Sequence, residues 1–259
     1  MTMNRSHIEW TEVTWNPTTG CTKVSRGCKN CYAERWAKMQ NKRGISQYRN
    51  GFNLTLAPNR LNEPRKLTTP SLIFVNSMSD LFHEGISDSY ISMVFDAMNE
   101  SSSHTFQILT KRIERVKYLS PYIRWSENIW LGVSVEHNDF VSRIDELRDT
   151  SAKNKFISFE PLLGEIANAN LEGIDWVLVG GETGRRARKM EKEWVLSIKK
   201  KCRSANIPFF FKQWGKHDFN PNVNDPTAAK THPHYSKGGC MIDDAIYRDY
   251  PKNKRWPCR

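Results

Sequence analysis

Short apolar runs alternate with longer amphipathic segments over much of this chain. The apolar runs occupy residues 71–80, 104–112, 128–137, 154–164, 175–184 and 207–215. Most are followed by a segment with helical periodicity, such as 86–101 or 190–206. Their hydrophobicity is continuous rather than alternating, as burial on both faces of a parallel sheet requires. With a more polar run at 8–16, the pattern predicts an α/β fold, a full or partial TIM-like (β/α) barrel of about six to seven parallel strands. An open doubly wound sheet is the alternative.

The length and composition fit one domain. A chain of 259 residues with 38% hydrophobic residues can bury one substantial core. We therefore expect residues 1–215 to form the barrel domain, with a long insertion near 40–70. Residues 216–259 lack periodicity and are rich in Pro, Asn, His and Lys. They predict an irregular C-terminal extension that covers or wraps the barrel and is not an independent domain.

Polar residues gather where each apolar run ends. In order they are Asn76, Ser77, Ser79, Asp80, Thr110, Lys111, Arg112, Ser134, Glu136, Glu160, Gly180, Gly181, Glu182, Lys212, Gln213 and Trp214. Ligands of parallel β/α folds bind at the carboxyl ends of the strands, so these residues predict one shared site. The carboxylate of Glu160 needs a partner at such a place. A salt bridge with Lys111 or Arg112 and contact with a ligand are both open.

Three of the six cysteines, Cys21, Cys28 and Cys31, lie in one short stretch. The chain starts with the polar stretch MTMNRSHIEW and has no run of about 18 apolar residues, so we expect a cytoplasmic protein. Thiols stay reduced there, and clustered cysteines are more often metal ligands or catalysts than disulfide partners. The other three are scattered and are expected to be ordinary free cysteines: Cys202, Cys240 and Cys258.

The spacing of the clustered cysteines narrows the choice of metal. Structural zinc modules commonly contain two cysteine pairs, whereas here only Cys28 and Cys31 form a C-x2-C pair. Three thiolates can instead hold three irons of a 4Fe-4S cluster, which leaves the fourth iron open to another ligand. An open iron indicates chemistry rather than architecture.

Three cysteines after a first strand, at the carboxyl edge of a β/α barrel, resemble the radical S-adenosylmethionine (radical SAM) enzymes. The commonest spacing there is C-x3-C-x2-C, and this chain has C-x6-C-x2-C. The stretches HIEWTEVTWNPTTGCTKVSRGCKNCYAERWA, LTKR, WLGVSVE, SFEPLLG, WVLVGGETG and PFFFKQWG together resemble a phage-associated family of three-cysteine-motif proteins of unknown function. That resemblance covers nearly the whole chain to Gly215.

The resemblance implies a mechanism and a set of site residues. S-adenosylmethionine would bind the open iron of a 4Fe-4S cluster held by Cys21, Cys28 and Cys31, and one electron would release a 5′-deoxyadenosyl radical that abstracts hydrogen from the substrate. We expect the remaining cofactor contacts from the strand ends: Ser77, Ser79 and Asp80 at the methionyl group, Ser134 and Glu136 at the ribose or amine, and Glu160, Gly180, Gly181 and Glu182 lining the site. Tyr32 and Trp36 are expected to pack in the core.

A net charge of +11 predicts attraction to polyanions. This charge favours a nucleotide or nucleic acid as substrate. The segment 185–189 carries four cations, and we expect it to bind phosphate unless its arginines pair with Glu136 or Glu160. A phage protein would act in the host cytoplasm, where modification of DNA bases is one such reaction.

Two other classes of function stay open. One is a nucleic-acid-binding protein without turnover, whose cysteines hold a structural metal. The other is a zinc-dependent hydrolase with cysteine ligands. No partner protein, reaction outcome or oligomeric state follows from the residues.

Overall fold

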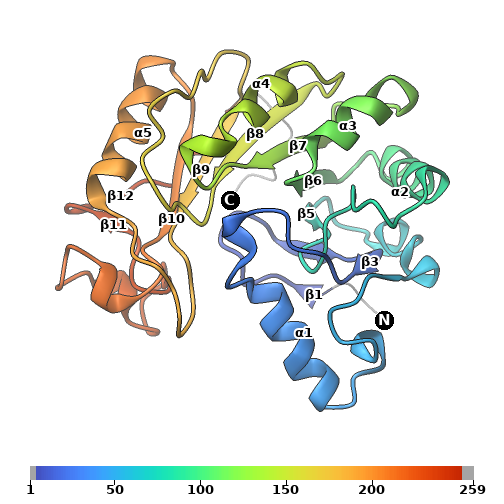
Figure 1. Ribbon diagram of the computed structural model, residues 1–259, viewed down its shortest axis with the longest axis horizontal. Helices are drawn as coiled ribbons and strands as arrows, with labels where there is room; N and C mark the ends of the chain where they lie inside the picture. Colours follow the sequence, from blue (N-terminus) through green and yellow to red (C-terminus); the bar gives the residue numbers. More distant parts are fainter. Residues whose placement is uncertain (1–3, 253–259) are drawn as a thin grey trace.

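The fold is a seven-stranded parallel half-barrel, seen in a computed structural model that describes residues 4–252 (Figure 1). The parallel strands are β2 Val13–Trp15, β5 Leu72–Val75, β6 Thr105–Thr110, β7 Ile129–Ser134, β8 Asn154–Phe159, β9 Trp176–Gly180 and β10 Phe209–Gln213. Their spatial order follows their order in the chain, and β1 (Asn4–Arg5) adds an antiparallel edge to β2. A doubly wound sheet needs a reversal of strand order, and the parallel strands within residues 4–252 show none. The prediction of a partial barrel with about seven parallel strands is thus confirmed.

Helices follow most strands of the sheet (Figure 1). They are α1 Tyr32–Lys42, α2 Asp88–Glu100, α3 Ile113–Leu119, α4 Ser142–Arg148 and α5 Lys192–Ser204. Helices α2 to α5 cover the outer face of the sheet, whereas α1 packs on the insertion near Tyr48. The start of α2 is fixed by Ser87, whose hydroxyl accepts the backbone N–H of Tyr90 at 3.3 Å, as an N-cap does. Between β8 and β9 the chain makes an irregular connection without a helix.

The two faces of the sheet bury different side chains. On the outer face, residues such as Ile73, Val133 and Val177 pack with the helices in one large core. The inner face carries a second cluster of aromatic rings. It contains Phe74, Trp130, Phe156, Trp176 and Phe210 from the strands, and Trp10 from the N-terminal segment. This double burial explains why the strands are apolar without alternation.

The insertion and the extension are mostly irregular. The insertion contains β4 (Thr55–Leu56), which pairs with β3 (Thr18–Thr19), and the extension contains the hairpin β11 (Met241–Ile242) and β12 (Ala245–Ile246). Short 3-10 turns lie at Arg26–Cys28, Ser46–Tyr48, Pro58–Arg60, Pro64–Lys66, Ser120–Tyr122, Asn138–Phe140, His217–Phe219 and Pro226–Ala228.

The extension returns to the open side of the half-barrel, between β2 and β10. Arg248 forms an antiparallel bridge with Phe210, and the Tyr250 ring lies 5.4 Å from the ring of Trp176. The Tyr250 hydroxyl then donates to the backbone oxygen of Glu9 at 3.1 Å. The N-terminal segment and the extension therefore meet across the gap. Within the part of the chain that is described, no helix is long and apolar enough to cross a membrane.

Candidate functional site

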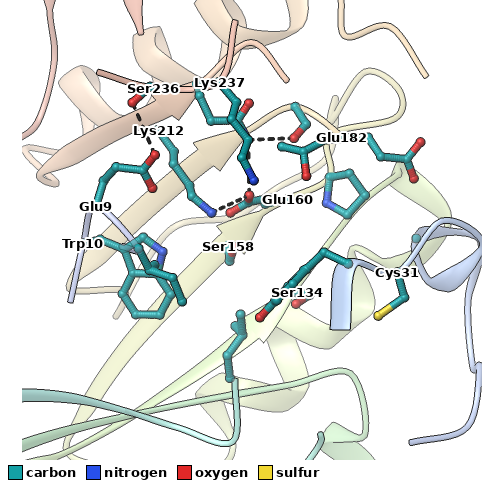
Figure 2. Close-up of a pocket in the computed structure, with 18 of the residues that line it drawn as sticks. Glu9, Trp10, Cys31, Ser134, Ser158, Glu160, Glu182, Lys212, Ser236 and Lys237 are labelled. Atoms are coloured by element: carbon teal, nitrogen blue, oxygen red, sulfur yellow. Dashed lines mark hydrogen bonds and ion pairs between the residues drawn. The ribbon is translucent and has the colours of Figure 1, made fainter. Parts of the chain in front are cut away.

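A cavity of about 550 Å³ lies inside the half-barrel at the carboxyl ends of its strands. Its walls come from the N-terminal segment, the cysteine-bearing loop, the ends of β6 to β10 and the extension (Figure 2). Trp10 and Phe74 form part of its floor, with ring centroids 4.7 Å apart. The site thus lies where ligands of parallel β/α folds bind.

The loop that bears the clustered cysteines, residues 20–31, is bent by glycines. Gly20 has φ +81°, and a Cβ at this position would lie 2.2 Å from the backbone oxygen of Asn53, so only glycine fits there. Gly27 donates its backbone N–H to Glu136 Oε1 at 3.2 Å, and a Cβ would come within 2.8 Å of that oxygen. These two contacts fix the loop against the barrel rim.

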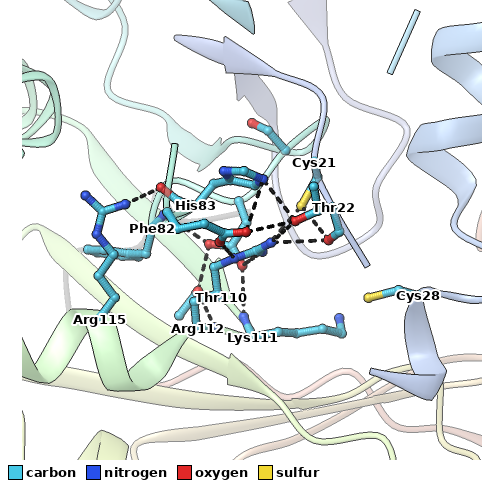
Figure 3. A network of polar contacts seen from close by, with 12 residues as sticks. Cys21, Thr22, Cys28, Phe82, His83, Thr110, Lys111, Arg112 and Arg115 are labelled. Carbon is cyan, nitrogen blue, oxygen red and sulfur yellow. Dashed lines mark hydrogen bonds and ion pairs between the residues drawn. The ribbon is translucent and has the colours of Figure 1, made fainter. Parts of the chain in front are cut away.

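The three thiols of the loop are free and partly exposed. Cys28 and Cys31 line the cavity, whereas Cys21 lies beside Arg112 (Figures 2 and 3). As the side chains stand in residues 4–252, no three His, Cys, Asp or Glu are grouped so as to hold a metal ion. Three unpaired thiols on one loop are nevertheless a donor set that suits iron. Cys202 and Cys240 are buried in the core, and Cys258 lies outside the described residues.

The surroundings of Cys28 and Cys21 shift the pKa values of the two thiols in opposite directions. Burial would raise the pKa of the Cys28 thiol, but the Lys111 ammonium and hydrogen bonds from the backbone of Val24 and Ser25 outweigh it and lower the pKa below its usual value. Burial raises the pKa of Cys21 to about 11, although Arg112 acts in the opposite direction. In metal-free protein, Cys28 is the more readily ionised of the two.

This difference predicts selective alkylation. At pH 8, a thiol with a pKa of about 11 is thiolate in roughly one molecule in a thousand, so iodoacetamide should modify Cys28 well before Cys21 in metal-free, reduced protein. Trypsin can cut between the two cysteines, after Lys23 and Arg26, so mass spectrometry can follow each separately. The two rates should converge in denaturant, and equal rates in the folded protein would contradict the prediction.

A buried arginine connects the loop to the end of β6 (Figure 3). The Arg112 guanidinium donates to Cys21 Sγ at 3.4 Å and to Asp80 Oδ2 at 3.2 Å through Nη1. It also donates to the Thr22 hydroxyl at 2.8 Å through Nη2 and to Glu84 at 2.8 Å through Nε. Asp80 accepts in addition from Thr110 at 2.7 Å. The carboxylate of Asp80 therefore orients Arg112, and Arg112 holds the start of the loop.

Three residues predicted to bind the methionyl group are used within the protein instead of facing the cavity. The hydroxyl of Ser77 exchanges hydrogen bonds with Asn16, and that of Ser79 donates to the backbone oxygen of Thr18 at 2.9 Å. Asp80 is paired with Arg112. None of the three lines the cavity. These side chains therefore support the cysteine-bearing loop and its surroundings, and their predicted contact with the methionyl group stays a prediction.

The other predicted residues divide between the cavity and its support. Ser134, Glu160, Gly181 and Glu182 line the cavity. Glu136 does not: it is fully buried and accepts from Gly27 and from Arg143 Nη1 at 3.0 Å. Gly180 lies beneath Glu160, where a Cβ would approach its carboxyl carbon to 3.1 Å.

The basic segment 185–189 is partly used by an ion pair. Arg188 Nε donates to Glu182 Oε2 at 2.9 Å, and Asn30 donates to the same oxygen at 2.9 Å. Burial would raise the pKa of Glu182, but Arg188 and Asn30 lower it. The expectation that Arg188 is free for phosphate is therefore wrong, and its partner is Glu182 rather than Glu136 or Glu160.

The partner of Glu160 is Lys212, a strand-end residue that the sequence did not indicate as its partner. Lys212 Nζ donates to Glu160 Oε1 at 2.8 Å, so the suggested bridge to Lys111 or Arg112 is not formed. Burial would lower the pKa of Lys212, but Glu160 and Glu9 raise it, so the ammonium form is retained.

Several cavity residues were missed from the sequence. Tyr32 lines the cavity, and neither it nor Trp36 is in the core, since they are 48% and 47% exposed. Trp10, Ser158 and Lys237 also line the cavity. Only Ser158 carried a signal, because it belongs to the apolar run whose end carries Glu160.

Comparison with known proteins identifies the family. A model of proteins of unknown function, DUF5131, matches residues 5–251. The chain belongs to this family. Curated proteins give no match. Among solved structures, a mutant spore photoproduct lyase with bound AdoMet and dinucleoside spore photoproduct is similar, with a TM-score of 0.45 and 10% identity over 77% of this chain. The match spans 63% of that neighbour's length.

Proposed function

We propose that this DUF5131 protein is a radical SAM enzyme with a 4Fe-4S cluster held by Cys21, Cys28 and Cys31. The observation that carries the proposal is the loop at residues 20–31, which bears three free thiols and places two of them, Cys28 and Cys31, in the wall of the cavity. A structural metal site needs no such cavity, because its ligands close around the ion.

The residues of the chain have separate tasks in this proposal. The three thiols hold the cluster, and Arg112 and Glu136 fix their loop at Cys21 and Gly27. When bound, the cluster and S-adenosylmethionine supply the electron and the 5′-deoxyadenosyl radical that abstracts hydrogen from the substrate. Glu182 lines the cavity beside the cysteine-bearing loop, where it can bind the cofactor. The N-terminal segment and the extension enclose the cavity and limit access of water.

The proposal also covers the substrate, the origin of the protein and its domain bounds. The net charge of +11 supports a nucleotide or nucleic acid as substrate. A phage origin, and with it action on DNA in the host cytoplasm, stays a prediction that rests on the resemblance of the sequence. We also propose that 1–215 is the catalytic domain and that 216–259 belongs to it as an extension.

Anaerobic reconstitution tests the proposal. We expect brown protein with about four irons and four sulfides per chain, as a 4Fe-4S cluster contains, and formation of 5′-deoxyadenosine from S-adenosylmethionine after reduction. Chromatography with mass detection measures the nucleoside. A colourless protein with one zinc per chain would instead support one of the two alternatives, a structural metal site or a hydrolase.

A further inference from the structure

The inner wall of the cavity carries polar groups that the protein itself does not satisfy. Ser134 and Ser158 are register partners on β7 and β8, so their side chains lie side by side on the inner face. Both residues are buried and line the cavity, and neither hydroxyl has a hydrogen bond within residues 4–252. The cavity-lining atom that is buried without a partner is Gln213 Oε1, and because buried polar atoms are nearly always paired, it indicates a polar ligand or water beside these two hydroxyls.

An ion pair extends this wall toward the open side. Lys212 and Gln213 both donate to Glu160 Oε1, at 2.8 and 3.4 Å, whereas Oε2 has no partner in the described part of the chain. Lys212 has protons to spare beyond the one given to Glu160. The wall therefore offers an acceptor, a donor and two hydroxyls that can act as either (Figure 2).

The floor below this wall is aromatic. Trp10 and Phe74 reach the cavity, and behind them Phe156 and Trp176 lie 6.1 and 6.2 Å from Trp10 between ring centroids. Aromatic rings favour flat, polarisable ligands, which bury their faces without leaving polar atoms unpaired. A saturated or purely aliphatic ligand would leave the wall unsatisfied, at a free-energy cost for each buried polar group.

The charges of the cavity define the rest of the ligand. Lys212 is neutralised by Glu160, and Glu182 is neutralised by Arg188. Lys237, on the extension, also lines the cavity, and no ion pair is recorded for it among the described residues. An anionic group outside the polar wall would suit this ammonium.

We propose that the cavity binds a nucleobase above Trp10 and Phe74, with the base edge at Ser134, Ser158 and Glu160 and its phosphate at Lys237. The inference deepens the proposed function, because it assigns the substrate of the same site to bases that carry a phosphate. The base belongs to the substrate and not to S-adenosylmethionine. A free nucleotide and a nucleotide in a strand share this chemistry.

Calorimetric titration of the metal-free full chain tests the inference. The probes are AMP, GMP, CMP and UMP, their nucleosides, inorganic phosphate, and a thymidine trinucleotide. We expect at least one monophosphate or the trinucleotide to bind, and to bind tighter than its nucleoside or phosphate alone. The trinucleotide binding tighter would assign the site to nucleic acid, and the reverse to free nucleotides. Absence of binding by all nucleotides overturns the inference.

Variants separate the base contacts from the phosphate contact. Ser158→Ala removes a hydroxyl without an internal partner and should weaken nucleotide binding about threefold to tenfold, whereas Ser204→Ala on the outer helix α5 should not. Glu160→Gln should weaken it at least tenfold. Unchanged affinity in both Ser158→Ala and Glu160→Gln overturns the base contacts.

The phosphate contact has its own matched pair. Lys237→Gln should remove most of the preference for nucleotide over nucleoside, and Lys153→Gln, exposed just before β8 at the opposite end of the barrel, should keep it. A Lys237→Gln protein that keeps the full preference overturns this contact.

The remaining controls distinguish this inference from binding of S-adenosylmethionine at the same site and from the proposed function. Displacement of the nucleotide by excess S-adenosylmethionine would assign the base site to the cofactor and overturn the inference. Nucleotide binding by a protein that never takes up iron would refute the proposed function and leave this inference standing. A protein that takes up a cluster and forms 5′-deoxyadenosine but binds no nucleotide would support the proposed function and overturn this inference.

Discussion

Replacement of Cys28 by alanine should abolish nearly all iron and sulfide uptake and, with it, formation of 5′-deoxyadenosine. The reason is that a cluster held by three thiolates loses a third of its protein ligands, and Cys28 is the one whose pKa is lowered by Lys111 and the loop backbone. Iron and acid-labile sulfide per chain, measured after anaerobic reconstitution, give the result directly.

Cys240→Ser is the matched control for the cysteine variant. Cys240 is a free cysteine as well, but it is buried in the extension, and its thiol donates to the backbone oxygen of His234, which a serine hydroxyl can do too. Iron content should therefore stay at the parent level. Full cluster content in Cys28→Ala, or equal loss in both variants, would show that the loop does not hold the metal.

The sequence predicted the strands well because each is buried on both faces. Runs such as 129–134 and 154–159 have no alternative place in a folded chain than the middle of a sheet. It also located the cysteine-bearing loop and the polar strand ends, since both depend on neighbours in sequence. These features are local, and local patterns are what a single sequence reveals.

The direction of each polar side chain could not be predicted in the same way. Ser134 faces the cavity, whereas Asp80 follows a turn at Asn76, which has φ 59°, and points to Arg112. In a strand, side chains alternate between the two faces of the sheet, so an error of one residue places a side chain on the wrong face. The turn that follows a strand does not continue this alternation.

Contacts between distant segments were also hidden. Tyr250 and Trp10 enter the same open side of the barrel from opposite ends of the chain. No periodicity marks the segment that contains Tyr250, so its place depends on rings it meets only after folding. The pairing of Arg188 with Glu182 is similar, because charge alone suggested a free phosphate site.

Replacement of Arg112 by alanine should lower the free energy of unfolding of the metal-free protein by about 3 kcal/mol, because it leaves the buried carboxylate of Asp80 without its cation. Asp80 keeps Thr110 and backbone donors, so the loss should fall at the low end of the range for such pairs. Denaturant titration followed by circular dichroism measures the change.

Glu84→Gln is the matched comparison, since it removes another carboxylate from the same guanidinium. Glu84 is 65% exposed in its side chain, so the change should cost only about 0.5 kcal/mol. Arg112→Lys keeps the charge but not the several donors that reach Cys21, Thr22 and Asp80 at once, and it should fall between the two. Iron content after reconstitution should follow the same order, because the guanidinium holds the start of the cysteine-bearing loop. If Arg112→Ala unfolds no more easily than Glu84→Gln, the buried pair does not stabilise the fold and the loop must be held by other contacts.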